Sequence, residues 1–169
     1  MPVWDETVPL TPANLDSPGL YVVYRRATVQ SIPNNTHTEV LFNDRVVAVG
    51  DWDTISVESV NFAIPESGVY ELGVSASLEK SGAVDGYFQA TVTVNNLSVT
   101  ADAPLRVGES FGGYQGAEAN ASGVSRPLSL NANDLVRLFI FQNTGSALDL
   151  SANGSSPYLW MRRLGAQAV

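Results

Sequence analysis

The chain has 169 residues, enough for one domain with its own core, and it contains no cysteine, which excludes disulfides and thiolate metal sites. Charged residues make up only 15% of it, below the usual share of about 25%. The formal net charge of −8 argues against nucleic acid as a partner, and no apolar run reaches the ~20 residues that span a bilayer.

Prolines recur through residues 1–19 and disfavour both helix and interior strand, which predicts an extended arm. The segment shows no secretory signal pattern, so we expect synthesis in a cytoplasm. Its apolar residues include Leu15 and the four candidate docking residues Val3, Trp4, Val8 and Leu10. Exposed apolar side chains are a liability, which favours an arm that docks on a partner over an unattached terminus. Residues 20–169 are predicted to form the folded domain.

The turn at Pro65–Gly68 and the strand that follows it organise this domain. Proline presets φ for an early turn position, and Gly68 is expected to supply a positive φ. Beyond the turn, Tyr70, Leu72 and Val74 alternate with polar or small residues, which is the period of a half-buried strand. Further short strands are predicted, in chain order, at residues 20–24, 27–32, 39–43, 45–49, 88–94, 97–100, 128–130, 135–141 and 158–161.

Residues 101–126 are rich in glycine, alanine and serine and are predicted to be a long loop with one weak strand. The glycines do not form a phosphate-binding loop, because no Gly-x-x-x-x-Gly-Lys pattern is present. Phe111 and Tyr114 are the aromatic residues of this window. They are candidates for contacting a ligand.

Three predicted strands are apolar on both faces, whereas an antiparallel strand in a sandwich usually has one face toward water. We interpret the second faces as a subunit interface, with a covering loop or ordinary core as the alternative. The candidate interface residues are Tyr21, Val23, Leu135, Phe139, Phe141, Tyr158 and Trp160. The whole pattern predicts an all-β protein, a single antiparallel jelly-roll sandwich of about ten strands.

The pattern Phe62-x-x-Pro65-x-x-Gly68-x-Tyr70, followed by Leu128-x-Leu130, Asn133-Asp134 and a closing aromatic strand, resembles the complement-type globular head domain. That domain belongs to the tumour-necrosis-factor-like jelly-roll superfamily. Asn133 stands where glycine is usual, and asparagine tolerates the left-handed conformation that the turn needs. The resemblance covers roughly residues 27–165 and implies a tight trimer whose axis is lined by apolar side chains.

Catalytic motifs are lacking in the sequence. His37 is the only histidine, no Gly-x-Ser-x-Gly motif occurs, and we predict neither an enzyme nor a cofactor. Asp51 and Asp53 are weak candidates for a calcium site, with solvated loop carboxylates as the alternative.

Jelly-roll trimers with such arms resemble the decoration, or cement, proteins of tailed-phage capsids. The resemblance implies a virion structural protein on the capsid exterior, with itself and the major capsid protein as partners. The alternative is a receptor- or glycan-binding head of a phage tail fibre or spike, using Phe111 and Tyr114. A hydrolase around Asp51 and Asp53 is a third, weaker hypothesis.

Overall fold

The computed structural model describes residues 19–52, 59–79, 86–95, 105–111, 118–151 and 157–166. Every regular element in these ranges is a strand, and none of them contains a helix long and apolar enough to cross a membrane. The predicted division into an arm at 1–19 and a domain at 20–169 stays a prediction, because residues 1–18 lie outside the described part. The thirteen strands are β1 (Tyr21–Arg25), β2 (Gln30–Ile32), β3 (Thr38–Glu39), β4 (Asp44–Val49), β5 (Phe62–Ala63), β6 (Gly68–Glu79), β7 (Tyr87–Val94), β8 (Leu105–Phe111), β9 (Glu118–Val124), β10 (Leu128–Leu130), β11 (Leu135–Gln142), β12 (Leu148–Leu150) and β13 (Tyr158–Gly165).

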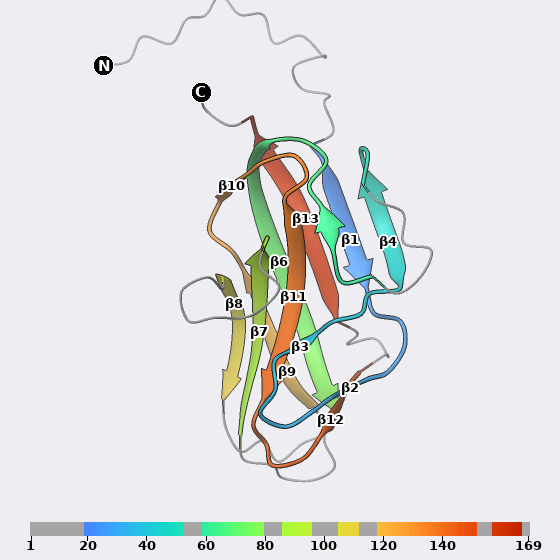
Figure 1. The fold of residues 1–169 in the computed structure, drawn as a ribbon, viewed down its shortest axis with the longest axis vertical. Helices are drawn as coiled ribbons and strands as arrows, with labels where there is room; N and C mark the ends of the chain where they lie inside the picture. Colours follow the sequence, from blue (N-terminus) through green and yellow to red (C-terminus); the bar gives the residue numbers. More distant parts are fainter. Residues whose placement is uncertain are drawn as a thin grey trace, which may run out of the picture.

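The strands form two antiparallel sheets that lie over one another (Figure 1). The eight-stranded sheet has the order β2-β12-β6-β13-β1-β4, and β9 and β10 also pair with β6. The five-stranded sheet has the order β3-β11-β7-β8, with β5 on β11. The predicted all-β sandwich of jelly-roll type is confirmed, and β6 lies at its centre as the longest strand.

The core lies between the two sheets and contains the inward side chains of the long strands. Tyr24, Phe42 and Phe62 are at most 1% exposed, and the rings of Tyr24 and Phe62 stack with centroids 3.9 Å apart. Along β6, Tyr70, Leu72 and their alternate neighbours are buried. This confirms the predicted period of two.

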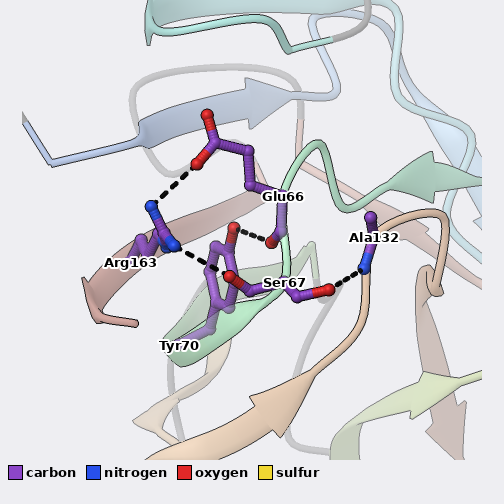
Figure 2. A network of polar contacts seen from close by, with 5 residues as sticks. All are labelled: Glu66, Ser67, Tyr70, Ala132 and Arg163. Carbon is purple, nitrogen blue, oxygen red and sulfur yellow. Dashed lines mark hydrogen bonds and ion pairs between the residues drawn. The ribbon is translucent and has the colours of Figure 1, made fainter. Parts of the chain in front are cut away.

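The corner at Pro65–Gly68 is tied to two other parts of the chain by a polar network (Figure 2). The Tyr70 hydroxyl donates to the Glu66 carbonyl at 2.7 Å, and Arg163 of β13 pairs with the Glu66 carboxylate at 2.8 Å. Arg163 also donates to the Ser67 carbonyl, while the Ser67 hydroxyl accepts from the Ala132 backbone N–H. The network fixes how β6 enters the sheet.

Burial raises the pKa of Tyr70, and the Arg163 guanidinium partly opposes this shift.

The structure corrects the expectation of a positive φ at Gly68. Gly68 does not have a positive φ, whereas Asn133 does, at 70°, as predicted for that turn. Gly68 is needed for space instead, because a Cβ built there would lie 2.7 Å from the Gly165 carbonyl oxygen and 2.5 Å from Arg163 Nε.

Replacing Gly68 with alanine should therefore lower the free energy of unfolding by about 1–3 kcal/mol, the usual cost of overpacking. Urea denaturation followed by tryptophan fluorescence would measure the loss. Gly165→Ala is the matched control, because a Cβ at Gly165 meets nothing within 4 Å, and we expect it to change stability by less than about 0.5 kcal/mol. Equal stabilities for both variants would contradict the close approach at Gly68.

The prediction of a loop with one weak strand over residues 101–126 was wrong, because β8 and β9 both lie in this window. β8 pairs with β7, and β9 pairs with β6 from Gly73 to Glu79. Small, glycine-rich residues have low strand propensity, and here the pairing with long neighbouring strands overrides it. The strand predicted at 97–100 falls outside the described residues, and β12 had no counterpart among the predictions.

Candidate assembly surface

The outer face of the eight-stranded sheet carries a continuous apolar row across five neighbouring strands. In strand register, Val47 of β4 lies opposite Val23 of β1, and Val23 lies opposite Trp160 of β13. Trp160 in turn lies opposite Gly73 of β6, and Gly73 lies opposite Val124 of β9. We call these five residues the apolar row.

The members of the row point away from the core. The sequence neighbours of Val23 and Trp160 are fully buried, whereas Val23 and Trp160 themselves are half-buried. At the two ends of the row, Val47 is 40% exposed and Val124 is 55% exposed. A row of apolar side chains on a sheet face is the kind of surface that a partner covers.

The indole of Trp160 lies directly over Gly73. A Cβ built on Gly73 would come within 2.0 Å of Trp160 Cε2, so the ring occupies the place that any other side chain would fill. Glycine inside a strand weakens it and marks a close approach, which is its role here. The ring thereby fills the middle of the row.

Ion pairs flank the row on both sides. Arg25 of β1, two residues after Val23, forms an ion pair with Asp44 of β4. On the other side, Arg162 of β13 pairs with Glu71 of β6 at 2.8 Å. Exposed pairs of this kind contribute little stability. They mark the apolar row as bounded by a polar rim, which is the usual anatomy of an interface core.

The structure divides the predicted interface residues between two opposite faces. Four of them lie on the outer face of the eight-stranded sheet, namely Tyr21, Val23, Tyr158 and Trp160. The other three lie on the outer face of the five-stranded sheet, namely Leu135, Phe139 and Phe141. Phe139 is only 4% exposed within the single chain, whereas Leu135 and Phe141 are half-buried.

The remaining predicted site residues fall largely outside the described part of the chain. The arm residues Val3, Trp4, Val8 and Leu10 lie there, as do Tyr114 and Asp53. Phe111 ends β8, where its backbone pairs with Tyr87 of β7. Asp51 is exposed, and the described residues contain no cluster of three or more histidines or acids that could hold a metal.

Sequence reasoning missed three members of the row. Gly73 carried a usable signal, because it interrupts a strand pattern, and interior glycines mark close approach. Val124 lay in the window predicted as a loop, so its position on a sheet could not be foreseen. Val47 belonged to a predicted strand whose outer face had no distinguishing pattern.

Comparison with solved structures shows which known fold this chain shares. Murine APRIL aligns with a TM-score of 0.60 and 13% identity over 86% of this chain and 99% of that one. The Eiger TNF of S. frugiperda aligns at 0.57 and 10% identity over 90% and 96% of the two chains. The globular domain of the zebrafish complement 1qA protein aligns at 0.51 and 17% identity over 90% and 99%.

No family model matches the sequence, and no curated protein matches it either. At identities this low, the structural likeness establishes the fold and nothing finer. The predicted resemblance is confirmed at that level. The chain has the jelly-roll fold shared by tumour-necrosis-factor-like proteins and complement globular heads.

Proposed function

We propose that this protein is a non-enzymatic virion component, a homotrimeric decoration protein that docks on a capsid surface and stabilises it. The observation that carries the proposal is the apolar row. Its apolar side chains are partly exposed on the outer face of a sandwich whose core is well packed. A structural role also agrees with a sequence that has one histidine and no nucleophile motif.

Self-association through the outer face of the eight-stranded sheet is the first step of the proposal. Burying Val23 and Trp160 removes half-exposed apolar area from water, at roughly 25 cal/mol per Å². The flanking ion pairs Arg25–Asp44 and Arg162–Glu71 stay at the rim of the contact, where the desolvation penalty of a charged group is lowest. The three-fold state follows from the resemblance to trimeric jelly rolls.

Capsid docking is the second step. Each subunit would contribute one arm with Val3, Trp4, Val8 and Leu10, and three arms on one trimer bind together more tightly than one. Stable contact needs on the order of 1,000 Å² of buried surface or more, which an extended arm supplies efficiently. The contact area that each trimer adds would strengthen the capsid against internal pressure.

Deleting residues 2–18 should abolish binding to capsids of the parent virus while leaving the trimer intact. The deletion spares Leu20, which is buried just before β1. Co-sedimentation with capsids measures binding, and light scattering measures the mass, expected near three times the chain mass of 18.0 kDa. Full capsid binding by the truncated trimer would refute the role of the arm, and a monomeric wild-type protein would refute the assembly.

A further inference from the structure

A second group of aromatic side chains lies on the opposite side of the sandwich from the apolar row. His37 precedes β3, Phe141 lies near the end of β11, and Tyr87 begins β7. The ring centroids of His37 and Phe141 are 4.7 Å apart, and those of Tyr87 and Phe141 are 6.0 Å apart. We call these three residues the aromatic patch.

The patch faces outward. Ile140 and Gln142 on either side of Phe141 are fully buried, and Phe88 next to Tyr87 is 2% exposed. Phe141 and Tyr87 are half-buried, and His37 is exposed. The rings are tilted rather than coplanar, at 35° and 53°, so they present more than one aromatic surface.

Amide and hydroxyl side chains border the patch. Asn143 accepts a hydrogen bond from the Tyr87 backbone N–H through its Oδ1, and Asn34 accepts one from Gly145 in the same way. The Thr144 hydroxyl donates to Gln142. The carboxamide groups of Asn34 and Asn143 each also carry an NH₂ donor, for which the described residues show no acceptor.

The placement of the patch separates it from the proposed trimer contact. A ring with three-fold symmetry needs two surfaces on each subunit that converge on one axis. Surfaces on opposite faces of a sandwich point in opposite directions and do not converge on one axis. If the apolar row faces the axis, the aromatic patch lies on the outside of the trimer. This outward placement rests on the proposed function, whereas the chemistry of the patch does not.

We infer that the aromatic patch binds a neutral saccharide. Aromatic faces stack on the apolar C–H face of a sugar ring, while a few amide and hydroxyl groups beside them bind its hydroxyls. A net charge of −8 disfavours anionic ligands such as sulfated or sialylated glycans. Three copies on one trimer would bind a repetitive glycan surface with high avidity.

The test uses the full-length protein on an array of neutral, sialylated and sulfated oligosaccharides, followed by titration calorimetry with the neutral oligosaccharide bound best. We expect saturable binding that falls roughly tenfold or more in both His37→Ala and Phe141→Leu. Phe141→Leu keeps an apolar side chain, and His37 is exposed, so both variants should fold. Val29→Ser is the matched control on an exposed residue away from both surfaces and should bind as the wild type does.

Three outcomes would overturn the inference: no neutral saccharide bound, equal binding by both ring variants and the wild type, or binding to anionic glycans alone. Loss of capsid binding in Phe141→Leu without any saccharide binding would identify the patch as a protein contact. Light scattering on the same samples tests the trimer separately. A monomeric wild type that still binds the oligosaccharide would refute the proposed assembly and leave the saccharide site standing.

Discussion

Replacing Trp160 with aspartate should convert the proposed trimer into a folded monomer. The indole lies over Gly73 in the middle of the apolar row and is half-buried in the single chain, so the isolated subunit can solvate a carboxylate at that position. In an assembled interface the same carboxylate would be buried without a partner, which costs several kcal/mol. Light scattering should show the mass fall from three chains to one.

Two further measurements make this result specific. Val29→Asp places the same charge on a side chain that is 53% exposed and away from the row, and it should remain a trimer. Thermal unfolding of Trp160→Asp should stay cooperative, which shows that dissociation and not misfolding lowers the mass. A Trp160→Asp protein that keeps the wild-type mass would place the subunit contact elsewhere.

The long central strands of this fold could be predicted from the sequence. Strict alternation in β6 and the two-sided apolar pattern of β11 are local signals, and both strands formed where expected. β9 could not be predicted, because Ala119, Ala121 and Gly123 carry no strand signal of their own. Its position depends on pairing with β6, which is a tertiary contact that no window of sequence contains.

The candidate interface shows the same limit. The two-sided apolar strands predicted a subunit interface, or a covering loop or core, on their second faces, but the sequence does not say which strands share a sheet. Trp160 and Phe139 therefore appeared equivalent, although they lie on opposite faces of the sandwich. Only the strand order separates a surface that is open in the single chain from one that is already buried.

Because Phe139 is already buried in the single chain, we expect its substitution to have a different effect from that of Trp160. Its side chain is 4% exposed and lies outside the main core cluster, on the outer face of the five-stranded sheet. In register it lies between Thr91, which is fully buried, and Glu39 on β3. Burial here occurs within one chain, so the residue contributes to folding before any subunit contact forms.

Phe139→Asp should therefore prevent folding, in contrast to Trp160→Asp. An aspartate would place a buried carboxylate directly opposite the partly exposed Glu39, whose partner Arg137 lies 3.7 Å away and is itself almost fully buried. An uncompensated buried charge costs about 3–5 kcal/mol, and like charges opposite each other across strands add to it. Set against a usual total stability of 5–15 kcal/mol, that loss should produce aggregate or a protein without a cooperative melting transition.

Near-ultraviolet circular dichroism and thermal melting of the purified variants would test this difference. Phe139→Leu is the control, because it keeps an apolar side chain and should lose only about 1–2 kcal/mol while remaining a trimer. If Phe139→Asp instead gave a soluble monomer with near-wild-type melting, the outer face of the five-stranded sheet would be a subunit contact. The apolar row would then lose its place as the assembly surface.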